Sequence, residues 1–314
     1  MTENIRYDGS LKASVILKDL APFVPALSRF EEPLDLNLVF SGHGKHLDCP
    51  TLRLTNHHGL MIAGEAALSN WDAGMDMYIY GKLGNLTMTK EGINVLMTNL
   101  TGKVPPILQR LDYIRFNGEA AGYLHDLTLT GLFHTGAGMV KTDVMMSIDE
   151  QSMSRTYSGS VASADLDLGK LLNQEKKFGK VDFNVELKGF NYKNRYPESY
   201  IKGIISSFEY SQYQYENIML DGVYKDGGFN GRLSMDDANG SVQIDGNFNV
   251  AKTIPDFNLK ASVKNLRPHD LHLSDKYENA SISLGLTADF TGKSIDDMNG
   301  RISLDSLQLN CLLY

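Results

Sequence analysis

The sequence predicts an all-β protein: an elongated, curled antiparallel sheet of repeated units with a few short helices. Three observations predict this class: apolar and polar residues alternate with a period of two along most of the 314 residues, 29 glycines far outnumber 9 prolines, and one short motif recurs. Alternation gives each strand one apolar and one wet face, which is typical of antiparallel sheets. Many glycines and few prolines suit a chain with many strand ends and few rigid loops.

The recurring motif is a short hydrophobic hook followed by a long alternating strand that ends in glycine. One copy is Ser14–Phe23 followed by Pro33–Gly42. The other copies are Val161–Leu168 with Val181–Gly189 and Ser262–Leu271 with Ser281–Gly292. The distance from the hook leucine to the closing glycine is about 22 to 26 residues, which is in the range of supersecondary repeats.

This repeat predicts one continuous repetitive segment over residues 1–314. The expected repeat units lie near residues 10–42, 97–160, 161–260 and 261–314. Repetition of this kind points to an extended array rather than to one compact catalytic domain.

Strands are expected where the alternation is clearest. These places are Leu34–Phe40, Met75–Ile79, Val181–Leu187, Val242–Ile244 and Ile282–Phe290. Asn239–Gly240 is the best hairpin signal, and further turn or bulge candidates are Asp226–Gly228, Asp221–Gly222 and Asp245–Gly246. If each strand together with its turn takes about ten to twelve residues, the chain holds on the order of 25 strands.

Helical pattern is scarce, and we expect three short helices that act as caps or plugs against the sheet. They fall within Lys18–Arg29, Pro105–Leu111 and Asp167–Gln174. An open sheet of this size would leave its apolar face in water at high cost. The sheet must therefore close, fold into a sandwich, dimerise, or curl so that the apolar face lines a trough.

Charge and composition exclude several classes of protein. The net charge of −8 argues against a nucleic-acid partner, which needs clustered lysine and arginine. No stretch approaches the roughly 18 apolar residues of a transmembrane helix. Because no catalytic constellation is found, we expect neither an enzyme nor a cofactor.

The segment Gly42–Cys49 offers candidate metal ligands. His43, His46, Asp48 and Cys49 are of types that bind metals, but no second pair sits at a familiar spacing. We therefore interpret this segment as a solvated loop and expect no metal site. His57 and His58 would point to opposite faces if they lay on a strand.

An aromatic run at Phe208–Tyr215 could stack on sugars or bases. We favour a strand whose tyrosines pair across a sheet, because aromatic residues are enriched in strands.

The order of motifs after this run resembles a known family. A tyrosine-rich strand is followed by Asn-Ile-Met-Leu-Asp-Gly at Asn217–Gly222, a glycine-centred strand and the acidic turn Asp236–Asp237. This order is similar to the repeating unit of TamB/AsmA-like envelope proteins, especially the TamB-like proteins of Bacteroidota. The hook Ala164–Leu172 resembles the segment that follows such a unit, and the resemblance covers about residues 10–310.

The resemblance implies a taco-like β-groove and a bridge-like lipid transfer protein. Such proteins conduct phospholipids across the periplasm between the inner and outer membranes, and support outer-membrane protein assembly with a TamA-like barrel partner. The full-length protein would be anchored in the inner membrane through an N-terminal segment, so we expect this chain to be a fragment. The side chains expected to line the groove are Leu36, Leu38, Phe40, Phe183, Val185, Leu187, Ile282, Leu284 and Leu286.

Two other interpretations remain open from the sequence. The first is a structural or adhesive secreted β-repeat array, in which the same nine side chains would face a closed, dry core. The second is an outer-membrane β-barrel.

Overall fold

The computed structural model describes residues 5–21, 28–149, 151–152, 154–191, 198–249, 252–276, 278–293 and 297–311. These residues form 17 strands and a few short helices, which confirms the predicted all-β class. The chain divides into two compact units. Unit 1 is Met1–Ser147 with Lys170–Leu172, and unit 2 is Ile148–Gly169 with Asn173–Tyr314.

The strands of unit 1 are β1 (Arg6–Ile16), β2 (Pro33–His43), β3 (His46–Thr55), β4 (Leu60–Ser69), β5 (Tyr78–Thr89), β6 (Tyr113–Tyr123), β7 (Asp126–Thr135) and most of β8 (Gly138–Asp149). Those of unit 2 are β9 (Ser154–Asp167), β10 (Phe178–Asn191), β11 (Glu198–Tyr210), β12 (Tyr213–Lys225), β13 (Gly228–Asp237), β14 (Gly240–Asn249), β15 (Asp256–Leu266), β16 (Ala280–Thr291) and β17 (Asn299–Cys311). The helical elements are η1 (Leu17–Leu20), η3 (Gly74–Asp76), α1 (Lys90–Thr101), α2 (Pro106–Gln109) and α3 (Leu168–Leu172).

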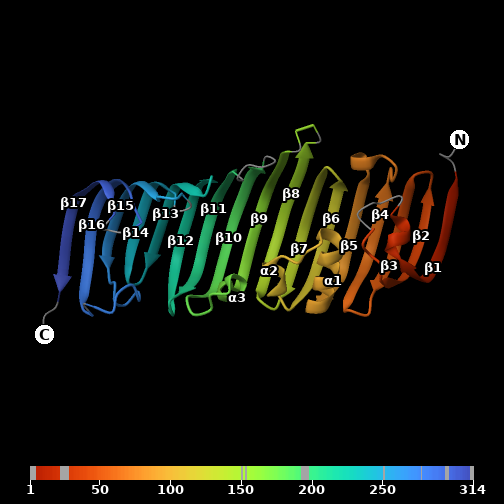
Figure 1. Cartoon of the computed structure of the whole chain (residues 1–314), viewed down its shortest axis with the longest axis horizontal. Coiled ribbons are helices and arrows are strands. Elements are labelled where there is room, and N and C mark those ends of the chain that lie inside the picture. Colours follow the sequence, from red (N-terminus) through yellow and green to blue (C-terminus); the bar gives the residue numbers. More distant parts are fainter. Residues whose placement is uncertain are drawn as a thin grey trace. The chain divides into compact units, whose positions relative to one another are not determined.

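Within each unit, every strand pairs antiparallel with the next strand along the chain (Figure 1). Among the described residues, the first strand of a unit does not pair with its last, so each sheet is open. Short hairpin connections make this the natural topology for antiparallel strands.

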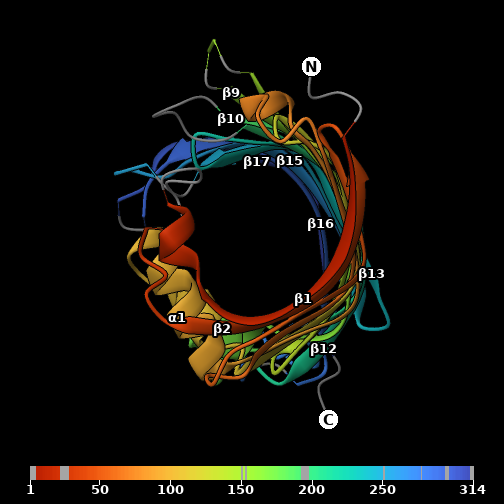
Figure 2. The same ribbon diagram turned by 90° about the vertical axis from the view of Figure 1, so that its right-hand side faces the viewer.

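The strands are strongly bent. Figure 2 shows β1 and β2 of unit 1, and β16 of unit 2, as long arcs rather than straight ribbons. Shifts of register accompany the bending, for example opposite Val39–Ser41, where β3 carries the extra residue, and opposite Gly285–Leu286, where β17 carries it. Such bulges insert an unpaired residue, which bends the strand and increases its twist.

The strands are fewer and longer than predicted. The expected number of about 25 is wrong, because each strand alone is 10 to 14 residues long. The strand expected over Met75–Ile79 is wrong in its first half, since Gly74–Asp76 forms η3 and β5 begins at Tyr78.

The hairpin signals divide into two groups. Asn239–Gly240 lies at the turn between β13 and β14, and Asp226–Gly227, both with positive φ, joins β12 to β13, so these predictions are confirmed. Asp221–Gly222 and Asp245–Gly246 are neither turns nor bulges, because both pairs lie inside β12 and β14 in uninterrupted register.

Three of the helical elements fall where short helices were expected: η1, α2 and α3. Residues 22–27 of the first expected helix lie outside the described residues. The longest helix, α1, was not predicted. Its ends are well defined, because the Thr89 hydroxyl accepts a hydrogen bond from the Gly92 amide and Gly102 ends the helix with a φ of 78°.

The third hook shows how these motifs are built. It begins as the end of β15 and continues as a compact turn in which Leu271 is fully buried. The hydroxyl of Tyr215, itself buried, donates a 2.7 Å hydrogen bond to the Leu271 carbonyl. The hook therefore packs against the sheet through Tyr215 and Leu271.

Candidate functional site

The candidate site is the apolar face of the bent sheet in each unit. In unit 1 the register places one apolar residue of each strand opposite another in the next strand. One such row, from β1 to β8, is Ala13, Leu36, Leu54, Ile62, Leu86, Phe116, Phe133 and Val140. Side chains directly opposite each other on antiparallel strands are in contact range, so the row forms a continuous apolar band.

Unit 2 has two apolar bands of the same kind, which lie side by side. One, from β9 to β17, is Val161, Val185, Gly203, Leu220, Leu233, Ile244, Ala261, Leu286 and Leu304. The next, from β10 to β17, is Phe183, Ile205, Ile218, Met235, Val242, Val263, Leu284 and Leu307. The apolar face is thus several side chains wide and crosses every strand of the unit.

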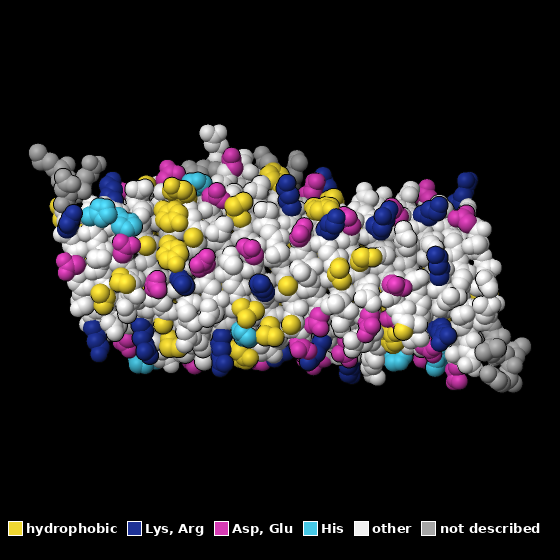
Figure 3. All heavy atoms as spheres, turned by 180° about the vertical axis from the view of Figure 1, so that it is seen from behind, with side chains coloured by type: hydrophobic (Ala, Val, Ile, Leu, Met, Phe, Trp, Pro, Cys, Tyr) yellow, Lys and Arg dark blue, Asp and Glu magenta, His cyan; other side chains and the backbone are white. Residues whose placement is uncertain are grey.

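The opposite face is polar and lies on the outer side of the bend. Figure 3 views this outer side and shows charged side chains spread over it, with apolar ones only in scattered places. In unit 2 the register aligns a row of alternating charge: Glu186, Lys202, Asp221, Arg232, Asp245 and Lys260. Because side chains alternate between faces, the apolar bands lie on the inner side of the bend.

The apolar bands are half-buried rather than buried. Of the described residues of the second unit-2 band, all from Phe183 to Leu284 are intermediate in exposure, and Leu307 is 55% exposed. A closed core would bury such side chains almost completely. The inner face is therefore accessible apolar surface.

One margin of the inner face in unit 1 is covered. There Leu34, Leu60 and Ile114 are 4%, 6% and 8% exposed, and Ile93 of α1 is 1% exposed. A Cβ atom on Gly92 of α1 would lie 3.3 Å from the Leu60 amide nitrogen, so the first turn of α1 lies against the start of β4. Helix α1 therefore caps this margin.

The structure places all nine predicted lining residues on the apolar faces. Leu36, Leu38 and Phe40 lie on the inner face of unit 1, opposite Ala13, Leu11 and Gly9. The other six lie on the inner face of unit 2: Phe183, Val185, Leu187, Ile282, Leu284 and Leu286. All nine are half-buried. Whether they contact lipid stays a prediction.

The sequence analysis missed an aromatic row along one side of the unit-2 inner face. Its members are Tyr224, Phe229, Phe248, Phe257 and Phe290, aligned in register from β12 to β16. Ring centroids are 5.7 Å apart for Phe229 and Phe248 and 4.8 Å for Phe257 and Phe290. The signal was the recurrence of one aromatic residue near the end of each strand, which becomes a row only when the register is known.

The predicted pairing of the Phe208–Tyr215 run is confirmed. Phe208 lies opposite Tyr215 and Tyr210 opposite Tyr213 on β11 and β12. The Tyr213 hydroxyl donates a 2.5 Å hydrogen bond to Asp237. Burial and this carboxylate raise the pKa of Tyr213 to about 12, so the phenol stays protonated at physiological pH.

The histidine-rich segment is not the solvated loop that the sequence predicted, because only Gly44 and Lys45 form the turn and His46, Asp48 and Cys49 lie in β3. His43 and His46 flank the β2–β3 turn with ring centroids 5.3 Å apart, and His46 contacts Asp48 at 2.9 Å. Cys49 is buried, and burial, followed by the nearby Asp48 carboxylate, raises the pKa of its thiol. Over the described ranges, no three histidine, cysteine or acidic residues are arranged to hold a metal ion.

Comparison with known proteins gives no relative: no family model, curated protein or solved structure shows a significant match to the chain. In the part of the chain that the structure describes, no helix is long and apolar enough to span a membrane.

Proposed function

We propose that the inner faces of the two units bind the acyl chains of phospholipids, and that the chain acts without catalysis as part of a lipid conduit. The observation that carries this proposal is the set of half-buried apolar bands that cross every strand of a unit. Acyl chains are the common cellular ligand that is apolar, flexible and long enough to follow such a band.

The energetics support this ligand class. Each methylene that leaves water for an apolar surface gains about 0.8 kcal/mol when it is fully buried. A bent sheet with a charged outer side and an apolar inner side can shelter acyl chains while polar headgroups stay in water. The half-buried state of the bands leaves this surface free for a ligand.

The resemblance to TamB/AsmA-like envelope proteins supports a location for this activity. We propose that the chain works in the periplasm, between the inner and outer membranes, as part of an inner-membrane-anchored protein. A TamA-like outer-membrane barrel is the partner we propose, with a role in outer-membrane protein assembly.

The test is native mass spectrometry of the chain purified without detergent, combined with lipid extraction of the same sample. We expect co-purifying phospholipid in the wild type. Leu284→Asp places a charge on the inner band and should lower the lipid content several-fold, because an unpaired charge beside acyl chains is costly.

Thr287→Asp is the matched control on the same strand. Thr287 is exposed on the outer face opposite Lys260, so its replacement should leave the lipid content unchanged. Ile244→Asp and Gln243→Asp form a second pair on β14, inner and outer respectively, in case one variant misfolds. A folded wild type that carries no lipid, or equal lipid loss in inner and outer variants, would contradict the proposal.

A further inference from the structure

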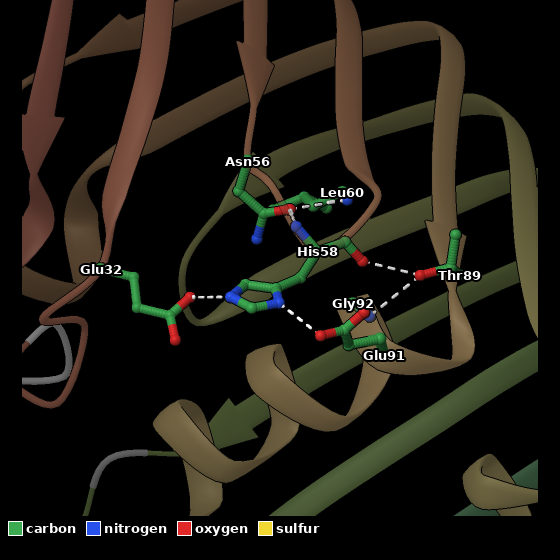
Figure 4. Close-up of polar contacts among 7 residues, drawn as sticks. All are labelled: Glu32, Asn56, His58, Leu60, Thr89, Glu91 and Gly92. Atoms are coloured by element: carbon green, nitrogen blue, oxygen red, sulfur yellow. Dashed lines mark hydrogen bonds and ion pairs between the residues drawn. The ribbon is translucent and has the colours of Figure 1, made fainter.

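His58 lies between two carboxylates that come from different parts of unit 1 (Figure 4). Its Nε2 is 2.9 Å from Glu32 Oε2, and its Nδ1 is 2.6 Å from Glu91 Oε1. Glu32 directly precedes β2, and Glu91 lies in the first turn of α1. His58 itself is in the turn between β3 and β4, not on a strand as the sequence analysis considered.

This geometry fixes the protonation state of the ring. Ionised carboxylates only accept hydrogen bonds, whereas a neutral imidazole has one N–H donor and one acceptor nitrogen. A neutral His58 would aim a lone pair at a carboxylate oxygen less than 3 Å away. With both carboxylates ionised, the two contacts are favourable together only when His58 is an imidazolium.

The contacts of His58 link the segments that cover the margin of the inner face, and further contacts connect these segments to α1. The Thr89 hydroxyl donates to the His58 carbonyl at 2.7 Å and caps α1. At the other end of α1, a Cβ atom on Gly102 would lie 2.8 Å from the Arg29 guanidinium. Arg29 thus lies at the C-terminal end of α1, Glu32 is linked to its first turn through His58, and Phe30 between them is 8% exposed.

We propose that His58 is a proton-dependent latch that holds α1 and the Arg29–Glu32 segment over the inner face of unit 1, and that loss of its proton loosens α1. The role of the latch rests on the proposed function: it would regulate how much of the apolar margin, including Leu34 and Leu60, a lipid can reach. The movement of α1 is a property of the chain alone.

The direction of the pH response follows from the carboxylates. The hydrogen bond to Glu91 is the largest cause and raises the pKa of His58; desolvation, the next largest, lowers it, and the charges of Glu32 and Glu91 raise it further, so the net direction is upward. A histidine whose folded-state pKa is raised stabilises the closed arrangement fully below its unfolded value of about 6.5, and loses that stabilisation as the pH rises through the folded value. The latch is therefore closed below about pH 6.5 and opens as the pH rises through the raised pKa of His58.

Other charged groups around the ring have partners or face water. Glu31 pairs with Lys18 at 2.6 Å, and Lys90 of α1 lies 3.9 Å from Asp112. The neighbouring His57 is exposed. Glu32 and Glu91 are thus the charged groups that face His58 from the elements packed against it.

The test is hydrogen exchange of the α1 amides, measured by mass spectrometry at pH 6.0 and pH 8.5. The change of the intrinsic exchange rate with pH is corrected with β12 of unit 2 as the reference segment. In the wild type we expect the protection of α1 to fall several-fold between the two values, since each unit of pKa shift corresponds to a tenfold change in the linked equilibrium. Equal protection at both values overturns the proposal.

Three variants separate the latch from general pH effects. His58→Lys keeps a charge to about pH 10 and should hold α1 closed at both values. Glu32→Gln supplies a donor to the neutral ring and should also remove the pH dependence. His57→Gln is the matched control and should behave as the wild type. If the protection of the α1 amides falls as much in His58→Lys as in the wild type between pH 6.0 and pH 8.5, the latch proposal is overturned.

A nitrogen-15 histidine spectrum of the wild type gives a second measurement that needs no variant to fold. His58 should show both ring nitrogens predominantly protonated at pH 6.5, because its pKa is raised above the ordinary histidine value of about 6.5; titration below 6.5 overturns the proposal. Lipid content measured at the same two pH values separates the two hypotheses. If α1 responds to pH as expected but the chain never carries lipid, the latch stands and the proposed function fails.

Discussion

The ring of Phe229 lies over Gly222 on the neighbouring strand of unit 2. A Cβ atom on Gly222 would come within 2.5 Å of Phe229 Cζ and 2.6 Å of the Asn230 carbonyl oxygen. Gly222 pairs with Gly231, and Gly231 with Gly246, so glycines form a row directly beside the aromatic row. The absent side chain of Gly222 lets the Phe229 ring lie down onto the neighbouring backbone.

Gly222→Ala should therefore destabilise unit 2. We expect a loss of about 1 to 3 kcal/mol in the free energy of unfolding, because the added methyl group meets both a ring and a backbone oxygen. Urea unfolding gives the measurement. Gly81→Ala is the matched control, since no atom lies within 4 Å of its Cβ position, and it should be neutral or slightly stabilising.

Reversing one charge in the outer ladder should weaken unit 2 in a salt-dependent way. Arg232 binds Asp245 at 2.9 Å and pairs in register with Asp221 on its other side. Arg232→Glu places three acidic residues in a row and should cost about 0.5 to 1 kcal/mol at low salt, since these groups are exposed. Urea unfolding in 1 M NaCl should recover most of the loss. Arg232→Gln removes the cation without adding an anion and should cost less than Arg232→Glu; an equal loss in both variants at low salt would count against the ladder.

Thr89→Ala should loosen α1. The Thr89 hydroxyl accepts from the Gly92 amide at 3.2 Å, and loss of such a cap costs about 1 kcal/mol of helix stability. Hydrogen exchange of the α1 amides at pH 6.0 should accelerate about fivefold. Thr89→Ser keeps the hydroxyl and should exchange as the wild type; equal acceleration in both variants would show that the methyl group matters instead.

Tyr215→Phe should detach the third hook from the sheet margin. The variant leaves the buried Leu271 carbonyl without its donor, which costs about 1 to 3 kcal/mol. Proteolysis at Arg267–Ser274 is a direct readout, because the hook lies on the surface of unit 2. Tyr224→Phe, at a position 38% exposed, should leave cleavage unchanged.

Much of the inner face could be predicted because side-chain alternation is a local property. Period-two patterns at Leu36, Leu38 and Phe40 assign a face without any knowledge of the partner strand. The strand number was wrong for a related reason: curved strands with bulges run longer than the average strand, so turns were expected where Gly222 and Gly246 continue a strand.

Features that depend on register or on distant segments could not be predicted. The aromatic row exists only because Phe229, Phe248 and Phe257 fall opposite one another, and the alternating charges require the same knowledge. The contact of His58 with Glu32 and Glu91 joins residues 26 and 33 positions away, too far for any spacing rule. Helix α1 could have been found from Thr89, from Gly102 and from Ile93, Leu96 and Met97 at helical spacing.

Neighbour-only pairing also governs how such a chain can be made. Each strand of a unit finds its partner within one short connection, so β2 can join β1 and β3 can join β2 before later strands exist. Local pairing keeps the entropy of loop closure low and favours rapid, sequential pairing of strands from the N-terminus during synthesis. At every stage the growing end is an open strand edge, so the most recently added strand is the natural attachment point for a chaperone until its successor arrives.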